Sequence, residues 1–414
     1  MRILWLKSEL LHPVDKGGKI RTYQMLKHLT REHEVTYLAL ASPADAPESF
    51  ERAGEYSHKL ITVKWQERKK FSARFYLDLA LNLVSPLPYA LQKYRSTAMR
   101  LAIEREINRA RYDVVVCDFL VPSVNFKARG GITSVLFQHN VESMIWRRHY
   151  ETQTNAMKRA FFRNQWRKMR AYEQSVCRSF DCVIAVSEAD RDLMRDEFGI
   201  SAVYDVPTGV DTDYFRPSDG AKTERNNLVF TGSLDWLPNE DGIRWFTEQV
   251  MPRIKESIPG VTLTVVGRNP HPGLIEMSKR DSRVIVTGRV EDVRPYMDCA
   301  AAYIVPLRIG GGTRLKIYEA MAMEKAIVST TVGAEGLPVQ NGLDLLLADE
   351  PEEFADAVVR VLSDQEFANR LGSHASTRVR ERFGWDKAAE SFAAICQKAR
   401  GGHSQTLAAG YARH

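Results

Sequence analysis

The chain has 414 residues, of which 44% are hydrophobic and 27% charged, and its formal net charge is +6. Such a composition is typical of a globular protein with about two to three domains, and it excludes a fibrous or largely disordered chain. The mildly basic balance permits an acidic substrate or an anionic surface as a partner but demands neither.

Cysteine use and the N-terminal sequence favour a cytoplasmic protein. The five cysteines are odd in number and form no CxxC pair, which favours buried reduced thiols over disulfides or a metal site. Lys7 and Glu9 interrupt the first apolar run too early for a signal peptide, and no apolar run reaches the about 18–20 residues of a membrane span. We therefore expect any membrane contact to be peripheral, on the inner face.

The first half of the chain alternates short apolar runs with helical segments, which predicts a parallel sheet covered on both faces. The predicted strands are 3–6, 35–40, 59–63, 114–117, 134–137, 182–186 and 202–206. Gly17 and Gly18 lie between the first strand and a basic helix at about 19–31. This strand–glycine–helix unit either aims backbone N–H groups at an anion or is only a tight turn.

Polar residues follow the predicted strand 134–137, in the order Gln138, His139, Asn140, Val141 and Glu142. The carboxyl end of a buried parallel strand is where α/β folds bind ligands. His139 is therefore a candidate site residue because of its position.

A basic and aromatic stretch runs from 146 to 178, where nine cations stand against two acids. A basic helix with interleaved aromatics can lie at a membrane interface and attract anionic lipid. On this interpretation Arg163, Trp166, Arg167 and Lys168 form the membrane surface. The alternative is a core-packing helix with a solvated outer face, and nucleic-acid binding finds no recognised module in the chain.

The α/β pattern restarts after a linker-like stretch at 216–227, so the chain divides near 205–225. The predicted strands of the second half are 228–231, 262–266, 284–287, 301–306 and 326–329. We assign an N-terminal domain to 1–205 and a second domain to 206–385. A last helix at about 386–400 precedes a tail, 401–414, predicted to be disordered.

A glycine loop follows the predicted strand 301–306 and precedes a helix that begins near Thr313. Bare backbone and a helix N-terminus make an anion site, to which side-chain cations contribute, and a carboxylate one turn further suits a sugar diol. The residues concerned are Gly310, Gly311, Gly312, Thr313, Arg314, Lys316 and Glu319. Together they predict a nucleotide site, although a glycine-rich connection with a solvated first turn has the same composition.

The order and spacing of motifs in the second half resemble the retaining GT-B glycosyltransferases of family 4, or group 1. The similar pieces are 207–211 leading to Phe215, 230–233, 265–267, 286–288, 300–324, and 326–329 leading to 333–337. In the first half Gly17-Gly18, 139–142 and 183–188 are similar and collinear. The match covers about residues 200 to 385 most specifically.

This resemblance implies two Rossmann-like domains facing a cleft, with the donor held mainly by the second domain and the acceptor by the first. It implies that the final helix crosses back to the first domain. Glu319 would hold the ribose hydroxyls of the nucleotide, Gly17 and Gly18 would lie against the diphosphate, and His139 would reach the donor sugar. The loop 333–337, with Gly333 and Glu335, would help to close the nucleotide pocket.

The sequence departs from the family pattern at two places. Gly311 stands where the family commonly has a glutamate that contacts the donor sugar. After the first strand of the second domain, Gly232 is followed by Ser233 where an arginine is common, and no lysine follows near 238–239. We hypothesise that Arg314, Lys316 and Arg268 supply the missing positive charge, and that N–H groups of the three glycines replace the lost carboxylate.

The resulting functional expectation is a metal-independent retaining hexosyltransferase without a cofactor, using a nucleotide sugar as co-substrate. Its acceptor would be a glycan or lipid-linked molecule in cell-surface polysaccharide assembly. The sequence 211–213 has the DxD form of metal-dependent transferases, but it falls in the turn between the domains and is interpreted as structural. The alternatives are a GT-B-fold nucleotide-sugar epimerase and a basic adaptor that only binds a membrane or nucleic acid.

Overall fold

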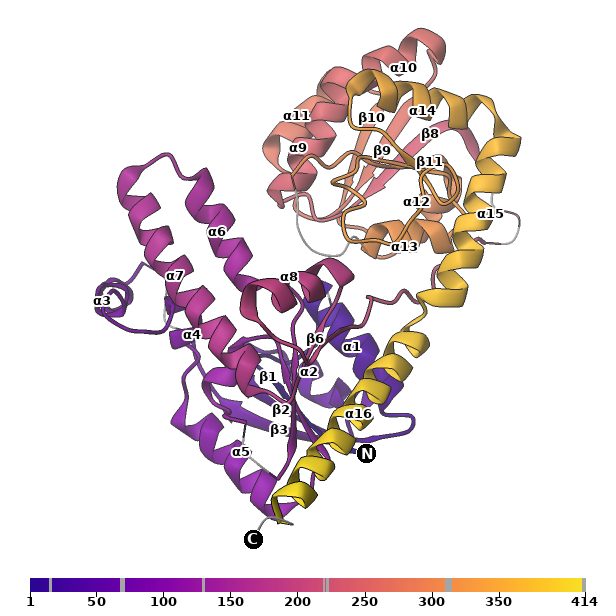
Figure 1. Cartoon of the computed structure of the whole chain (residues 1–414). Helices are drawn as coiled ribbons and strands as arrows, with labels where there is room; N and C mark the ends of the chain where they lie inside the picture. Colours follow the sequence, from indigo (N-terminus) through magenta and orange to yellow (C-terminus); the bar gives the residue numbers. More distant parts are fainter. Residues whose placement is uncertain are drawn as a thin grey trace. The chain divides into compact units, whose positions relative to one another are not determined.

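The structure is a computed structural model that describes residues 1–14, 17–67, 71–128, 131–218, 220, 223–309 and 315–411, with side chains as far as 401. The chain forms two compact units. Unit 1 comprises Met1–Pro207 with Ala388–His414, and unit 2 comprises Thr208–Lys387. Each unit is a parallel sheet with flanking helices (Figure 1).

Unit 1 contains a seven-stranded sheet of order β3-β2-β1-β4-β5-β6-β7, in which every adjacent pair is parallel. Its central strands read as continuous apolar runs because both faces are covered by helices. The strands are β1 (Arg2–Lys7), β2 (Glu34–Ala41), β3 (Lys59–Lys64), β4 (Val114–Asp118), β5 (Thr133–Phe137), β6 (Cys182–Ala185) and β7 (Val203–Asp205). The seven strands predicted for this half are confirmed.

The helices of unit 1 begin at residues that suit helix starts. Ser72, Ser96, Asn155 and Ser187 each accept a hydrogen bond from a backbone N–H of the first turn that follows. The helices are α1 (Gly17–Leu29), α2 (Pro47–Glu51), η1 (Arg52–Glu55), α3 (Ala73–Asn82), α4 (Tyr89–Gln92), α5 (Thr97–Arg109), η2 (Val121–Val124), α6 (Glu142–Thr152), α7 (Ala156–Ser179) and α8 (Glu188–Phe198).

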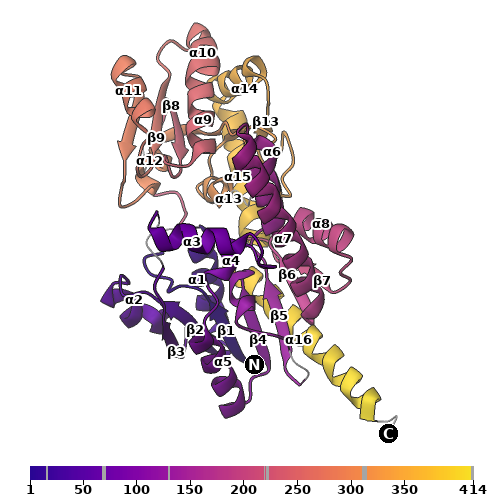
Figure 2. The same cartoon turned by 90° about the vertical axis from the view of Figure 1, so that its left-hand side faces the viewer.

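The basic stretch from 146 to 178 is two helices rather than one. α6 ends at Thr152, and α7 starts at Ala156 with Asn155 as its cap. Figure 2 shows α6 and α7 side by side. Their seam is aromatic, since the Trp146 and Phe162 ring centroids lie 6.1 Å apart.

Unit 2 contains a six-stranded parallel sheet of order β10-β9-β8-β11-β12-β13, the strand order of a classic Rossmann fold. Its strands are β8 (Glu224–Thr231), β9 (Thr262–Val266), β10 (Val284–Gly288), β11 (Ala300–Val305), β12 (Ile327–Ser329) and β13 (Leu346–Leu347). The five strands predicted for this half are confirmed, and β13 was missed. The helices are α9 (Leu237–Trp245), η3 (Phe246–Val250), α10 (Met251–Ser257), α11 (Pro272–Arg280), α12 (Arg294–Cys299), α13 (Leu315–Ala322), α14 (Pro351–Ser363) and α15 (Gln365–Arg382).

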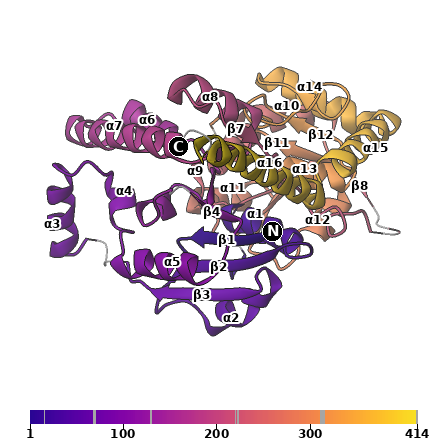
Figure 3. The same cartoon turned by 60° about the horizontal axis from the view of Figure 1, so that its bottom comes forward.

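The last helix, α16 (Trp385–Tyr411), returns to unit 1 and packs on its sheet (Figure 3). The Phe392 ring lies 5.4 Å from Trp5 on β1 and 5.2 Å from Phe137 on β5, measured between centroids. The predicted disorder of residues 401–414 stays a prediction. The backbone is helical to Tyr411, beyond the helix end predicted at about residue 400. Leucine, alanines and glutamine between 405 and 409 are good helix formers and explain the extension.

In both sheets the strand order reverses beside the first strand, between β1 and β4 in unit 1 and between β8 and β11 in unit 2. Loops diverge at such a switch point, so α/β proteins bind ligands at the carboxyl ends of these strands. Candidate site residues are therefore expected along these two edges.

Candidate functional site

A buried charged cluster lies at the carboxyl ends of β1 and β4. Lys7 Nζ is 2.9 Å from Asp118 Oδ1, and neither side chain is more than 2% exposed. Asp118 Oδ2 also accepts hydrogen bonds from Trp5 Nε1 at 2.9 Å and from Thr22 Oγ1 at 2.6 Å. Burial alone would raise the pKa of the Asp118 carboxyl, but Lys7 and then His139 hold that pKa below its ordinary value.

His139 follows β5 and completes this cluster. Its Nε2 lies 2.9 Å from Asp118 Oδ1. Burial lowers the pKa of the imidazole to about 3, against the raising effect of Asp118, so the ring is neutral at pH 7. We assign the proton to Nε2 because the Asp118 carboxylate lies beside that nitrogen. Nδ1 therefore presents a lone pair, and among the described residues nothing donates a hydrogen bond to it.

Aromatic rings and a glycine set the surroundings of His139. The centroid of the Phe119 ring lies 3.8 Å from that of His139, and the centroid of Phe137 lies 4.5 Å away. A Cβ on Gly18 would be 3.0 Å from the Phe119 ring and 4.0 Å from His139 Nδ1. The bare backbone of Gly18 thus brings the first turn of α1 close to His139, whereas Gly17 is exposed and has open space around it.

Sequence reasoning missed Lys7, Asp118 and Thr22. The signal was present in part, because Lys7 and Asp118 are polar residues that end apolar runs. Their partnership depends on β1 lying next to β4, which the order of strands along the chain does not reveal.

A buried carboxylate holds the chain that follows His139. Glu173 on α7 accepts hydrogen bonds from the backbone N–H groups of Glu142 at 2.8 Å and Ser143 at 2.9 Å, and from Gln138 Nε2 at 3.1 Å. It therefore caps α6 from a neighbouring helix. Burial raises the pKa of both Glu142 and Glu173 to about 7. Glu173 thus has a structural role that a count of charges did not predict.

In unit 2 the residues that follow β8 and β9, Gly232 and Gly267, are both glycine, so the two segments of backbone approach closely. A Cβ on Gly267 would lie 1.7 Å from the carbonyl oxygen of Gly232. Above Gly232, Lys316 Nζ donates to Asn239 Oδ1 at 3.1 Å and lies 3.9 Å from the centroid of the Phe230 ring. The ammonium of Lys316 thus reaches the end of β8, beside the segment where the family's lysine is missing.

Ser233 and Arg268 lie together at the same edge. Arg268 Nε donates to Ser233 Oγ at 3.1 Å, and Ser233 Oγ donates to Asp235 Oδ1 at 2.6 Å. Asn269 Nδ2 reaches the other oxygen of Asp235 at 3.1 Å. The positive charge of Arg268 is therefore held at the ends of β8 and β9, in a network with an exposed carboxylate.

Glu319 lies on α13, one turn after Lys316. Its side chain is partly exposed to solvent. Burial of the carboxyl by the surrounding protein raises its pKa to about 7, and the positive charge of Lys316 opposes that rise. A carboxyl that gains or loses its proton near neutrality suits hydroxyl groups as partners, because the ionised form accepts two hydrogen bonds.

Five candidates of the glycine loop, Gly310, Gly311, Gly312, Thr313 and Arg314, lie outside the described residues. Gly333 is a packing position, since a Cβ there would lie 2.4 Å from Ser329 Oγ and 2.7 Å from the carbonyl oxygen of Val305. Glu335 lies in the exposed turn that follows. In the turn at 211–213, Asp211 Oδ1 accepts a hydrogen bond from the backbone N–H of Tyr214 at 2.9 Å, which is consistent with a structural role.

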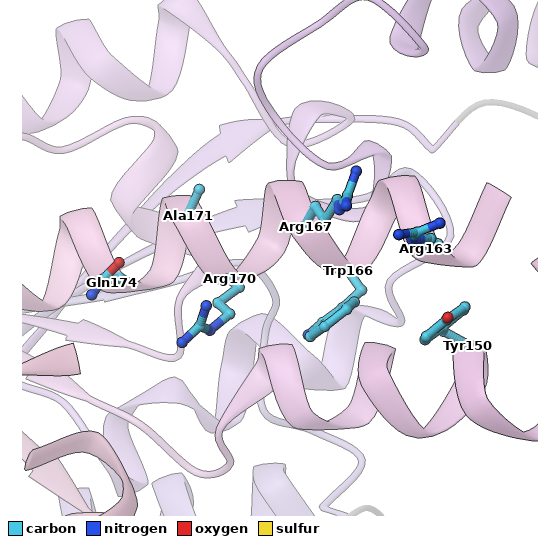
Figure 4. Close-up of a pocket in the computed structure, with 7 residues that line it drawn as sticks. All are labelled: Tyr150, Arg163, Trp166, Arg167, Arg170, Ala171 and Gln174. Carbon is cyan, nitrogen blue, oxygen red and sulfur yellow. The ribbon is translucent and has the colours of Figure 1, made fainter. Parts of the chain in front are cut away.

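The predicted membrane-surface residues divide between two roles. Arg163, Trp166 and Arg167 line an open pocket of about 490 Å³ on α7, together with Tyr150 of α6 (Figure 4). Trp166 is stacked on Tyr150 with centroids 5.7 Å apart, so its ring belongs to the helix seam. Lys168 Nζ instead donates to the carbonyl oxygens of Asn82 and Leu83 at the end of α3, at 2.5 and 3.1 Å.

Neither a membrane-spanning helix nor a metal-binding cluster of side chains occurs in the described part of the chain. No helix there is long and apolar enough to cross a membrane. No group of three His, Cys, Asp or Glu side chains there is arranged to hold a metal ion. The five cysteines are unpaired, and only Cys299 is not fully buried.

Two parallel-sheet α/β domains, with a final helix that returns to the first, define the GT-B class of glycosyltransferase fold. HepE of Anabaena, solved in complex with UDP and glucose, is similar over 95% of this chain and 99% of its own, with a TM-score of 0.63 at 14% identity.

Two family models match the sequence. One, described as glycosyl transferases group 1, matches residues 225–364, and one described as glycosyltransferase family 4 matches residues 16–214. The chain belongs to this group 1/family 4 of glycosyltransferases, so the resemblance noted from its motifs is confirmed.

Two relatives extend the comparison. A protein of Klebsiella pneumoniae described as an uncharacterized 44.6 kDa protein in the cps region is 22% identical over 394 residues, 92% of this chain and 96% of that protein. A GDP-mannose-dependent alpha-(1-6)-phosphatidylinositol monomannoside mannosyltransferase of Mycobacterium tuberculosis is 26% identical over 237 residues, 51% of this chain and 60% of that protein.

Proposed function

We propose that this protein transfers a sugar from a nucleotide-sugar donor, with retention of configuration, to a glycan or lipid-linked acceptor in the assembly of a cell-surface polysaccharide. The observation that supports this best is the grouping of Gly232, Lys316 and Glu319 at the carboxyl edge of the second sheet. Bare backbone and a cation suit a diphosphate, and a carboxylate one helical turn away suits a ribose diol.

The names of the relatives are consistent with the donor class and the acceptor class of this proposal. HepE is described with UDP and glucose, the Mycobacterium tuberculosis relative is named for GDP-mannose and a phosphatidylinositol mannoside, and the Klebsiella pneumoniae relative is named for the cps region. By analogy, we propose a nucleoside diphosphate as the leaving group and a carbohydrate as the acceptor.

In the proposed reaction the bond between the sugar C1 and the diphosphate oxygen breaks, and a bond from the acceptor oxygen to C1 forms on the same face. The acceptor proton passes to the departing diphosphate oxygen. Negative charge builds on the diphosphate as it departs, so fixed cations there stabilise the transition state more than the ground state. We assign this role to Lys316, Arg314 and Arg268, and we assign no carboxylate nucleophile and no essential metal.

We assign His139 to the donor sugar. Its Nδ1 lone pair is a buried acceptor without a partner among the described residues, and a sugar hydroxyl that reached it would donate a hydrogen bond there. Asp118 holds the ring in this orientation through Nε2. Asp118 is therefore a positioning residue in the proposal.

The first domain offers a pocket for the acceptor. It encloses about 380 Å³ between the inner side of α3 and α4, and it combines aromatic rings with charged and amide groups. Trp65, Phe75 and Tyr89 supply apolar faces for a sugar ring, while Asp78 and Gln92 supply hydrogen-bonding groups. This mixture suits a glycan, because sugar rings pack on aromatic faces and sugar hydroxyls hydrogen-bond to charged and amide groups.

The donor assignment is tested by thermal shift with UDP, GDP, ADP and dTDP, since a ligand present well above its dissociation constant raises the melting temperature. We expect one of the four to stabilise the protein clearly. Lys316→Met should reduce that shift, whereas Lys279→Met, an exposed cation of α11 in the same domain, should leave it intact. Stabilisation by none of the four would contradict the proposal.

Transfer is tested by release of nucleoside diphosphate. A transferase releases it in step with glycosylation of an added acceptor, whereas the alternative, an epimerase, converts the donor without an acceptor. The third possibility, a binding adaptor, predicts that Glu319→Ala leaves nucleotide binding and the cellular phenotype unchanged.

A further inference from the structure

An apolar stripe on α3 faces solvent. Residues at helical spacing on one side of this helix, Ala73, Tyr76, Leu77, Ala80 and Leu81, are all exposed. Tyr76, Leu77 and Leu81 are 55, 58 and 59% exposed. Phe71, Leu83 and Val84, just outside the helix, extend this surface at 76, 51 and 89%. Surface helices normally turn such a stripe toward the core, and a concentration of exposed large apolar side chains marks an interaction surface.

The inner side of α3 explains why the stripe faces outward. Asn82 is fully buried there and donates to the carbonyl oxygen of Leu87 at 2.8 Å, while Gln165 Nε2 donates to Asn82 Oδ1 at 2.9 Å. Phe75 packs edge-on against Tyr89, with centroids 5.7 Å apart. The Lys168 contacts with the carbonyl groups of residues 82 and 83 fix the end of the helix. The polar anchors thus hold α3 with its apolar stripe outward.

Cations accompany this apolar surface. α7 has a single acid, Glu173, which is buried, so every exposed charged side chain of that helix is cationic. At its start Met157 is 83% exposed, and Lys158, Arg159 and Arg163 are exposed after it. Figures 1 and 3 show α3 and the turn between α6 and α7 on the same side of unit 1. On α3 itself, Arg74 flanks the stripe.

We propose that the apolar stripe of α3 inserts into the interface of an anionic lipid membrane, with the exposed cations of α7 facing the lipid headgroups. A short helix with one apolar side and neighbouring cations lies in the interfacial plane of a membrane. It binds anionic lipid both by burying its apolar side chains and by electrostatic attraction to the headgroups. A protein partner or a second copy of the chain would also bury the stripe, but the exclusively cationic surface of α7 favours a surface of opposite charge. This inference goes beyond glycosyl transfer and does not depend on it.

α3 lies at the same edge of the first sheet as the buried charged cluster. α3 follows the carboxyl end of β3, and the carboxyl ends of all strands in a parallel sheet lie on the same edge as Lys7 and His139. The inner side of α3 also lines the pocket that holds Phe75 and Asp78. A membrane under α3 would therefore present lipid-linked molecules at the site-bearing edge of the first domain.

Co-sedimentation of the full chain with vesicles tests the proposal. The vesicles contain phosphatidylglycerol and phosphatidylethanolamine in equal parts, and vesicles of phosphatidylcholine alone serve as the neutral comparison. The variant Leu77→Gln/Leu81→Gln removes two exposed leucines without opening a cavity. Its matched control, Ile285→Gln/Leu343→Gln, removes two side chains of unit 2 with similar exposure, 48 and 50%.

We expect the parent protein and the control to bind the anionic vesicles equally, and the α3 variant to lose roughly tenfold or more of its partition coefficient. Binding should weaken with salt and on neutralising Lys158, Arg159 and Arg163. The proposal is overturned if the parent does not sediment, if the α3 variant binds like the parent, or if the parent is a dimer that this variant dissociates. Nucleoside diphosphate binding, measured by thermal shift on the same proteins, reports on the proposed function separately.

Discussion

Asp118 and His139 face each other at 2.9 Å across the ends of β4 and β5, and the same carboxylate receives the ammonium of Lys7. Three ionisable groups therefore share one buried site. We expect Asp118→Asn to lower the free energy of unfolding by about 3–5 kcal/mol, because it leaves Lys7 buried without a counter-charge. Urea unfolding measures this loss.

A double variant is the control for the Asp118 prediction. Lys7→Met/Asp118→Asn removes both charges and should recover part of the lost stability. If Asp118→Asn unfolds at the same urea concentration as the parent, the ion pair does not contribute as the geometry indicates.

His139 should affect turnover more than nucleotide affinity. We expect His139→Ala to lower kcat roughly hundredfold, since it removes the group that we assign to the reacting sugar, and to leave the Kd of the nucleoside diphosphate within about threefold. Because burial lowers the pKa of His139 to about 3, the ring stays neutral from pH 5 to 8. The kcat profile should therefore show no step from this group, and a limb near pH 6.5 that disappears in His139→Ala would contradict the assignment.

The Glu319 carboxyl makes nucleotide binding pH-dependent. Its pKa in the folded protein is about 7, above the ordinary value of 4.5, so binding that requires the carboxylate should release a proton at neutral pH. Isothermal titration in two buffers of different ionisation enthalpy measures that release. Glu319→Gln should abolish it and weaken binding by about 1.5–3 kcal/mol.

The same carboxyl should also cost stability. Between pH 4.5 and 7 the folded protein retains a proton on Glu319 that the unfolded chain has released, so the free energy of unfolding falls as pH rises through this window. Glu319→Gln removes this slope, and we expect the variant to melt at a higher temperature than the parent at pH 8 but not at pH 4. If the variant and the parent melt at the same temperature at pH 8 and also at pH 4, burial does not raise the pKa of Glu319.

Two glycines at one edge should respond differently to alanine. In Gly267→Ala the new Cβ would overlap the carbonyl oxygen of Gly232 at 1.7 Å, so the backbone must shift, and we expect a loss of about 1–3 kcal/mol of stability. In Gly232→Ala it would meet Lys316 Nζ at 2.7 Å and Asn239 Nδ2 at 2.8 Å, the ends of side chains that can move. That variant should stay folded and bind nucleoside diphosphate more weakly, as calorimetry would show.

The fold was predictable from sequence because most strands are continuous apolar runs, and such runs fix the sheet without knowledge of distant contacts. β13 escaped because a two-residue strand within Leu345-Leu346-Leu347 has no periodicity of its own. Lys7 and Asp118 escaped as a pair because 111 residues separate them, and only the strand order joins them.

Helical periodicity also has a limit that α3 illustrates. The spacing of Tyr76, Leu77 and Leu81 defines a side of a helix but not the direction in which that side faces. Here Asn82 and Gln165 decide the direction through their hydrogen bond. Similarly, the basic stretch of α7 looked like one surface, whereas Trp166 packs on Tyr150 and Lys168 holds the end of α3.

The return of α16 to the first sheet bears on the order in which the protein can be made. Phe392 fills a position between Trp5 and Phe137, and a buried phenylalanine stabilises a domain by about 1.5–3 kcal/mol. The domain synthesised first therefore lacks a part of its core until the segment that contains Phe392 has left the ribosome. Premature termination anywhere in the second domain would leave the first one incomplete as well, which makes the folding of the first domain depend on the synthesis of α16.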